Sequence, residues 1–349
     1  FVEKGRMSES DKASTLAKMT WSKNIHAIKG ADIVIEAVIE NIEVKKALYA
    51  KVEPLIAKDA WLCTNTSSLS IAALSSDLKH PNRFGGLHFF NPAPLMPLVE
   101  IVPGIQSSPD FTDTMETLMN SWGKVPVIAK DTPGFIVNKV ARPFYSEAIK
   151  LYEEGVASVA QIDAAVKSIG FRMGPFELTD LIGHDINYTV TETVWSQFYY
   201  DPRFRPSITQ KRLKESGLLG RKSGRGFYNY ASGINAATEA QNKAEIDPKL
   251  GEKIVERILC LIINEALDTV WQGIAAPENV DLAMIKGVNY PKGPIQWGGE
   301  IGWDQVLEIL NLCHKHYGDD RYRPCPLLRH LNSGNAQLGE GQLTDNFMV

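Results

Sequence analysis

The sequence predicts an α/β domain with a parallel sheet, followed by two related all-helical domains. Three observations support this fold class. Short runs of β-branched residues alternate with helical spacing over residues 31–130. After Pro133-Gly134 the strand-like runs give way to helical patterns. The helical part then recurs at an offset of 118 residues, which indicates an internal repeat.

Within the α/β part, residues 31–40 predict a buried strand, and the apolar spacing over 41–55 predicts the helix that follows it. Further strands are expected at 60–64, 83–89, 98–102 and 125–128, and further helices at 70–75 and 111–122. Ligands in open α/β sheets bind beyond the carboxyl ends of the strands, so polar residues there are candidate site residues.

The helical part is predicted to begin with one long helix over 135–154, and residues up to 215 read as helical. The repeat is visible where Glu147-Ala148 recurs as Glu265-Ala266, and where the segment 203–206 recurs as 321–324. Residues 231–246 are small and polar, which suits a linker. The expected domains are therefore 1–132, 133–230 and 247–335, with the linker 231–246.

Composition excludes several functions. The net charge of -4 provides no basic surface for nucleic acid or for an anionic membrane, and no apolar run approaches the ~20 residues that span a bilayer. The pair His314 and His316 has no third ligand nearby, so no metal site is predicted. The scattered cysteines fit a reducing, cytoplasmic setting; they are Cys63, Cys260, Cys313 and Cys325.

Four residues could carry chemistry. Ser67 and His88 lie at the carboxyl ends of predicted strands, and Glu100 lies twelve residues after His88, where a turn could bring its carboxylate to the imidazole. A histidine held by a glutamate is a general base with a fixed tautomer. Asn138 would enter the cleft from the first helical turn of the next domain. From chemistry alone, a structural histidine, a helix cap at Ser67 and a surface Asn138 remain open alternatives.

Five sequence strings together resemble the L-3-hydroxyacyl-CoA dehydrogenase family, from residue 1 to about Tyr230. They are Asn65-Thr-Ser-Ser-Leu, Leu87-His-Phe-Phe-Asn-Pro, Asp131-Thr-Pro-Gly-Phe-Ile-Val-Asn, Met173-Gly-Pro-Phe-Glu-Leu-Thr-Asp and Gly224-Arg-Gly-Phe-Tyr. The tail, from about 247 to 335, looks like a second copy of the C-terminal helical domain of that family. The resemblance implies a Rossmann-type doubly wound sheet and NAD-dependent interconversion of L-3-hydroxyacyl-CoA and 3-ketoacyl-CoA. The expected substrates are short-chain acyl-CoA thioesters of fatty-acid β-oxidation or a related CoA pathway.

The resemblance also implies roles. His88 would take the proton of the 3-hydroxyl, Glu100 would orient His88, and Ser67 and Asn138 would bind the substrate oxygens. Matches to cofactor-contacting positions are Glu40, Lys45, Ser67, Asn91 and Lys222. Lys4 matches a position that contacts the CoA moiety, and the acyl-CoA is the expected partner.

Two departures qualify the resemblance. The family opens with a Gly-x-Gly-x-x-Gly turn and an acidic strand end, and neither occurs here, so we expect an incomplete, N-terminally truncated sheet. Without that turn, a non-catalytic scaffold subunit stays an alternative. A β-hydroxyacid dehydrogenase acting on a free acid is another alternative, although such enzymes use a catalytic lysine.

The second helical copy is expected to be non-catalytic. At the repeat offset Asn138 falls on Glu256, and no sheet domain precedes the second copy to supply a histidine. Relatives with one copy resemble dimers joined through this domain, so two copies in one chain are expected to form an internal pseudo-dimer. Pairing of whole chains as a homodimer is left open.

Overall fold

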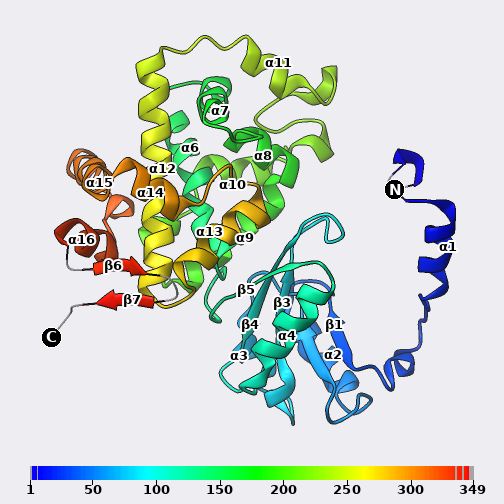
Figure 1. The fold of residues 1–349 in the computed structure, drawn as a ribbon. Coiled ribbons are helices and arrows are strands. Elements are labelled where there is room, and N and C mark those ends of the chain that lie inside the picture. Colours follow the sequence, from blue (N-terminus) through cyan, green and yellow to red (C-terminus); the bar gives the residue numbers. More distant parts are fainter. Residues whose placement is uncertain (1, 6, 335, 340–341, 346–349) are drawn as a thin grey trace.

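The structure, a computed structural model, describes residues 2–5, 7–334, 336–339 and 342–345. Figure 1 shows a lobe built on a sheet beside a larger lobe of helices. An N-terminal segment carries the 3-10 helix Val2–Lys4, helix α1 (Glu9–Ala17) and the 3-10 helix Ile25–Ile28, and it extends away from the sheet lobe. Helix α1 buries none of its residues.

The sheet contains β1 (Ile33–Glu36), β2 (Trp61–Thr64), β3 (Phe84–Phe89), β4 (Leu98–Pro103) and β5 (Val125–Ile128), in that spatial order. Neighbouring strands are parallel except β3 and β4, which are antiparallel. The prediction of a parallel sheet is therefore wrong at this pair. Residues 90–97 between the two strands are too few for a crossover, which takes roughly a dozen residues.

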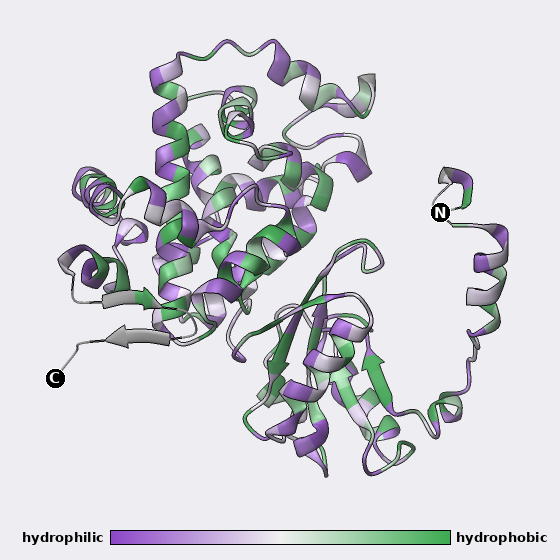
Figure 2. Ribbon diagram, in the orientation of Figure 1, coloured by the Kyte–Doolittle hydropathy of each residue, from purple (hydrophilic) through white to green (hydrophobic). Residues whose placement is uncertain are grey.

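Helices cover both faces of the sheet. Helix α4 (Asp110–Ser121) packs on one face, where Phe111, Met115 and Met119 contact Leu87 and Ile101 of the strands. Helices α2 (Ile42–Val52) and α3 (Ile71–Ser75) belong to the core of the opposite face, and the 3-10 helix Pro81–Arg83 precedes β3. In the colouring of Figure 2 the strands are largely hydrophobic, as expected for strands buried on both faces.

The helical lobe consists of two successive sets of helices. The first set is α5 (Val137–Val140), α6 (Arg142–Glu153), α7 (Val159–Ser168), α8 (Pro175–Ile182), α9 (His184–Gln197), the 3-10 helix Pro202–Phe204 and α10 (Ile208–Glu215). The second set is α12 (Pro248–Trp271), α13 (Pro277–Val288), α14 (Pro294–Ile301), α15 (Trp303–Tyr317), the 3-10 helix Asp320–Tyr322 and α16 (Pro326–Ser333). Elements α6 to α10 recur as α12 to α16 at an offset of 118 or 119 residues.

The predicted single helix over 135–154 is wrong, because the chain breaks it into α5 and α6. Pro143 explains the break. Proline has no amide hydrogen, and its ring clashes with the carbonyl four residues earlier. The repeat supports this reason, since position 261 of the second copy is Leu261 and α12 runs through it without interruption.

The two helical sets pack against each other with reciprocal contacts. Arg203 of the first set pairs with Glu265 of the second at 3.1 Å, and Arg321 of the second pairs with Glu147 of the first at 3.2 Å. Both arginines and both glutamates are separated by the repeat offset. A second reciprocal pair is Arg205–Asp319 with Arg323–Asp201. Such exchange of equivalent contacts is the geometry of a two-fold, isologous interface.

The expected linker is partly structured. After the 3-10 helices Arg221–Ser223 and Tyr230–Ser232, residues Ala236–Asn242 form α11, which buries Ala237 and Gln241 against the first helical set. Gln241 donates hydrogen bonds to Asp163 and Glu177, so this segment is docked to the lobe. Two further strands, β6 (Ala336–Gly339) and β7 (Gln342–Asp345), pair in antiparallel fashion, and the sequence did not predict them.

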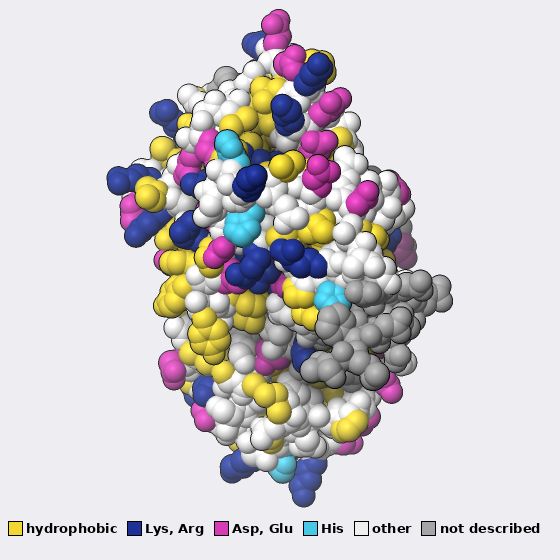
Figure 3. Space-filling model, turned by 90° about the vertical axis from the view of Figure 1, so that its left-hand side faces the viewer, with side chains coloured by type: hydrophobic (Ala, Val, Ile, Leu, Met, Phe, Trp, Pro, Cys, Tyr) yellow, Lys and Arg dark blue, Asp and Glu magenta, His cyan; other side chains and the backbone are white. Residues whose placement is uncertain are grey.

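The surface agrees with the mild net charge. On the face shown in Figure 3, basic and acidic side chains are interspersed. In the described part of the chain, no helix is both long enough and apolar enough to cross a bilayer.

Candidate active site

The polar residues predicted at the strand ends meet at one edge of the sheet. His88 on β3 and Glu100 on β4 are direct cross-strand partners in the antiparallel register. His88 Nδ1 lies 2.6 Å from Glu100 Oε2, and the two side chains are 8% and 0% exposed. Because a carboxylate only accepts hydrogen bonds, Nδ1 carries the proton, and Nε2 of the neutral ring is an acceptor that bonds to none of the described residues.

Glu100 also joins the two lobes. Its Oε1 accepts hydrogen bonds from the backbone N–H groups of Ile136 and Val137, both at 3.0 Å. These groups open α5, and the chain reaches them through a tight turn in which Gly134 and Phe135 have φ of 76° and 48°. One buried carboxylate therefore fixes the imidazole and the entry of the helical lobe together.

Aromatic rings enclose the imidazole. The ring centroids of Phe90 and Phe135 lie 4.5 Å and 5.8 Å from that of His88. Gly287 of α13 packs behind them, because a Cβ at that position would come within 2.5 Å of Leu98 and 3.6 Å of Phe90. The second helical set thus supports the wall of the site, which the sequence did not reveal.

Ser67 and Asn138 face each other across the two lobes. Asn138 Nδ2 donates to the backbone carbonyl of Ser67 at 3.3 Å. Beside them, Gln197 at the end of α9 donates to the carbonyl of Ser68 at 3.1 Å. Ser67, His88, Glu100 and Asn138 are therefore connected through the two strand ends and α5, whereas Gln197 had no signal in the sequence.

Glu40 organises the loop that carries Ser67. Its Oε1 accepts hydrogen bonds from the Thr66 hydroxyl at 2.7 Å and from the backbone N–H groups of Ser67 and Ser68 at 2.8 Å and 3.0 Å. Burial acts to raise the pKa of Glu40, but these hydrogen bonds and the charge of Lys45 outweigh it and lower the pKa below its ordinary value. Glu40 is thus a carboxylate that shapes the strand-end loop.

Lys45 is buried at the same edge. It is 1% exposed, and its Nζ lies 2.7 Å from Glu36 Oε1 and 3.5 Å from Glu40 Oε2. Glu36 also accepts hydrogen bonds from Tyr49 at 2.6 Å and Thr64 at 2.8 Å. This paired cation holds β1, β2 and α2 together directly below the loop of Ser67.

The remaining predicted site residues lie at different places. Asn91 is exposed, two residues beyond the end of β3, and precedes Pro92 through a cis peptide bond. Lys222 pairs with Asp185 at the first turn of α9. Gln197, which contacts Ser68, lies at the opposite end of α9, and a helix of that length places its two ends ~20 Å apart. The structure therefore does not bring Lys222 to the His88 cluster. The side chain of Lys4 lies outside the described residues.

A second buried histidine pair has a structural setting. His184 Nε2 lies 2.7 Å from Asp180 Oδ1, and both side chains are fully buried. Asp180 also accepts the backbone N–H groups of Phe227 and Tyr228, both at 2.9 Å. Gly226 has to be glycine here, because a Cβ would lie 2.0 Å from Asp180. The glycine-rich stretch 220–230 therefore wraps Asp180.

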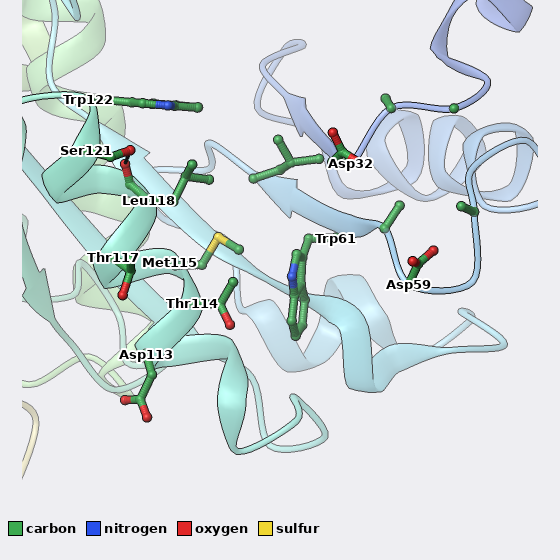
Figure 4. A pocket seen from close by; sticks show the side chains of 15 residues that line it. Asp32, Asp59, Trp61, Asp113, Thr114, Met115, Thr117, Leu118, Ser121 and Trp122 are labelled. Atoms are coloured by element: carbon green, nitrogen blue, oxygen red, sulfur yellow. Dashed lines mark hydrogen bonds between the residues drawn. The ribbon is translucent and has the colours of Figure 1, made fainter.

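A pocket of about 870 Å³ lies at the opposite side of the sheet lobe. Its walls are the start of β1, with Asp32 just before it, the start of β2 at Trp61, and the side of α4 that carries Thr114, with Trp122 just beyond its end (Figure 4). Because it borders the amino ends of these strands, it is separate from the edge that carries Ser67 and His88.

Two descriptions of one family match the chain. The 3-hydroxyacyl-CoA dehydrogenase NAD binding domain matches residues 1–132, and the C-terminal domain of the same family matches residues 134–230 and 254–342. Both helical sets therefore carry the same family domain.

Similar proteins agree with this family. The 3-hydroxyadipyl-CoA dehydrogenase of Escherichia coli K12 is 37% identical over 94% of this chain and 86% of its own length. The fatty acid oxidation complex subunit alpha of Acinetobacter baylyi is 32% identical, over 97% of this chain but 49% of its own length.

A solved structure is similar over the same range. The crystal structure of 3-hydroxybutyryl-CoA dehydrogenase from Escherichia coli K12 has a TM-score of 0.87 and 36% identity, over 95% of this chain and 88% of that one. The expected fold, a Rossmann-type α/β lobe followed by homologous helical domains, is confirmed. The chain belongs to the 3-hydroxyacyl-CoA dehydrogenase family.

Proposed function

We propose that this protein interconverts L-3-hydroxyacyl-CoA and 3-ketoacyl-CoA with NAD, and that His88 is the residue that moves the substrate proton. The observation that carries this proposal is the buried His88–Glu100 pair at 2.6 Å, at the sheet edge where α/β enzymes bind ligands. The match of residues 1–132 to the family's NAD binding domain supports NAD as the cofactor.

The residues at this edge fit the nicotinamide end of a dinucleotide. They offer a carboxylate, a hydroxyl and an amide side chain, from Glu40, Ser67 and Asn91, which follow the carboxyl ends of β1, β2 and β3. Bound NAD would accept a hydride from C3 of the substrate. No glycine-rich turn for the pyrophosphate occurs in the sequence before β1.

The side chains of the site then carry out proton transfer and hold the substrate in position. Nε2 of His88 accepts the proton of the 3-hydroxyl, and Glu100 stabilises the imidazolium that forms. Ser67 Oγ and the Asn138 amide hold the substrate oxygens, which fixes C3 relative to the imidazole. The Phe90 and Phe135 rings exclude water from this position. In the reverse direction His88 returns the proton to the forming alkoxide.

The second helical set is proposed to be a non-catalytic half of an internal pseudo-dimer. Glu256, at the position equivalent to Asn138, is exposed on α12. The reciprocal pairs around Arg203 and Arg321 support the two-fold packing. We further propose a cytoplasmic setting, which suits the free cysteines of the described chain.

The relatives' names suggest short substrates. One is named for 3-hydroxyadipyl-CoA and another for 3-hydroxybutyryl-CoA. We propose a short acyl-CoA thioester as substrate, in fatty-acid β-oxidation or a related CoA pathway.

The direct test is NAD-dependent oxidation of L-3-hydroxybutyryl-CoA by the intact protein, followed through NADH absorbance, with the D enantiomer as control. We expect turnover of the L form alone. The variant Asn138→Ala should lower kcat/KM by about 10- to 100-fold, the loss expected for one hydrogen bond to an oxygen that gains charge in the transition state. Equal rates with both enantiomers, or no NADH from L-3-hydroxyacyl-CoA of any length, would contradict the proposal.

A further inference from the structure

Arg142 is a buried cation that lacks a carboxylate partner. It opens α6 and is 5% exposed. Its Nε donates to the carbonyl of Asn138 at 2.8 Å, and its Nη1 donates to the Thr191 hydroxyl at 3.1 Å. The ring of Tyr145 lies 5.1 Å from its guanidinium carbon. Within the described part of the chain, no carboxylate oxygen lies within 4.0 Å of a guanidinium nitrogen of Arg142, the distance limit of an ion pair. All of these partners are neutral.

The other buried arginines have their Nη donors used or their charge paired. Both Nη groups of Arg83 donate to backbone carbonyls, those of Glu53, Ala57 and Ala60. Burial alone would lower the pKa of Arg257, but Glu147 and Glu154 raise it above its ordinary value. For Arg142, burial lowers the pKa, and only tyrosines oppose the shift. A buried charge without a counter-ion is costly, so its retention calls for a ligand that supplies the missing negative charge.

The guanidinium has an unused donor and an unused neighbour. Nη2 makes no hydrogen bond to the described residues, and it is not fully buried. It therefore touches space that solvent can reach. The charge of Arg142 also acts on Tyr290, whose buried hydroxyl has no partner among the described residues. Nη2, together with the second hydrogen of Nη1, can donate to the two oxygens of one carboxylate.

The position is one helical turn from the proposed substrate oxygens. Arg142 follows Asn138 by four residues, which is an axial distance of ~6 Å, and it hydrogen-bonds the Asn138 backbone. Thr191 lies on α9, whose last turn reaches Ser68 beside the strand-end loop. The guanidinium therefore lies deeper in the helical lobe than Asn138, on the α9 side. An acyl chain extended from C3 in that direction would end near it.

We propose that Arg142 binds the terminal carboxylate of a dicarboxylic acyl chain, and that the enzyme's substrate class is the short 3-hydroxydicarboxylic acyl-CoA thioesters. This inference rests on the proposed function. In a six-carbon diacid, three carbon–carbon bonds separate C3 from the terminal carboxylate, a span of about 4 Å. Together with the length of the guanidinium group, this span matches the one helical turn between Asn138 and Arg142.

The test compares L-3-hydroxyadipyl-CoA with L-3-hydroxyhexanoyl-CoA, which has the same chain length but ends in a methyl group. We expect the intact wild-type protein to favour the diacid in kcat/KM by at least about 30-fold. The variant Arg142→Met should abolish this preference, because the diacid value falls further than the hexanoyl value; any loss shared by both substrates comes from the lost hydrogen bond to the Asn138 carbonyl. Arg205→Met, which removes a half-exposed guanidinium from the surface, is the control and should keep the preference.

A binding measurement on the wild-type protein avoids dependence on the fold of the variant. Adipyl-CoA, which has no 3-hydroxyl, should inhibit competitively at a concentration at least about 30-fold below that of hexanoyl-CoA. Equal inhibition by the two thioesters, or an equal loss of both activities in Arg142→Met, would overturn the proposal and leave Arg142 as a support for Asn138. Absence of turnover with both substrates would contradict the proposed function, and the inhibition ratio would still decide the role of Arg142.

Discussion

Replacement of Glu100 by glutamine tests the coupling of the imidazole to the helical lobe. The change keeps the size of the side chain and removes its charge. At Oε2 an amide would donate toward His88 Nδ1, which forces the ring into the tautomer that has its proton on Nε2. That tautomer cannot accept a substrate proton, and no anion stabilises the imidazolium.

The expected magnitude follows from the roles of the two oxygens. Loss of general base function lowers kcat by about 10²- to 10⁴-fold, which corresponds to about 3–5 kcal/mol of transition-state stabilisation. The amide oxygen can still accept from Ile136 and Val137. We therefore expect the free energy of unfolding to fall by only about 1–2 kcal/mol, since two charged hydrogen bonds become neutral ones.

The assay is steady-state reduction of a 3-ketoacyl-CoA with NADH, together with denaturant unfolding. Asp281→Asn is the matched control, because Asp281 accepts the backbone N–H groups of Ile295 and Gln296 at 2.7 Å and 2.9 Å and touches no imidazole. One of these two acceptors becomes an amide group that faces a backbone N–H, so the variant should lose at least as much stability as Glu100→Gln, and it should keep its kcat. A Glu100→Gln enzyme with kcat within tenfold of wild type would refute the reasoning.

Two further predictions concern the helical lobe. Asp268 pairs with buried Lys139 at 2.9 Å, so Asp268→Asn should lower the free energy of unfolding by about 3 kcal/mol at neutral pH, measured with denaturant. Burial acts to raise the pKa of Asp268, but Lys139 and Arg203 hold it below its ordinary 3.8; the stabilisation is thus present above pH 3.8 and is lost as pH falls through the lowered pKa. A difference between the two proteins that grows on acidification would contradict this sign. Gly174→Ala should lower stability by about 1–3 kcal/mol in thermal unfolding, because its Cβ would lie 2.3 Å from Asp163, and an unchanged Tm would refute the clash.

The strands and the proposed base could be predicted from the sequence because they depend on local patterns. Alternation of β-branched runs with helical spacing located the five strands, and a histidine followed by a glutamate at the next strand suggested their pairing. The antiparallel return was missed, although the eight residues between β3 and β4 already exclude a crossover. Pro143 was likewise a local signal for the break between α5 and α6.

Other features depend on tertiary contacts that no local pattern reports. Gln197 reaches Ser68 only because α9 packs across α5, and Gly287 supports Phe90 only because the second helical set folds back on the sheet. The docking of α11 follows from one glutamine side chain, Gln241, in a segment whose composition suits a linker. The missing counter-ion of Arg142 is visible only when all neighbours are known.

The most direct test of the account compares His88→Gln with His184→Gln in single-turnover oxidation of an L-3-hydroxyacyl-CoA. Both histidines are buried and pair with a carboxylate, at 2.6 Å and 2.7 Å, but only His88 lies at the proposed reaction edge. We predict that His88→Gln slows NADH formation by at least about 10²-fold, while His184→Gln leaves it within about threefold. NADH formation in His88→Gln within tenfold of wild type would contradict the assignment of His88 as the base.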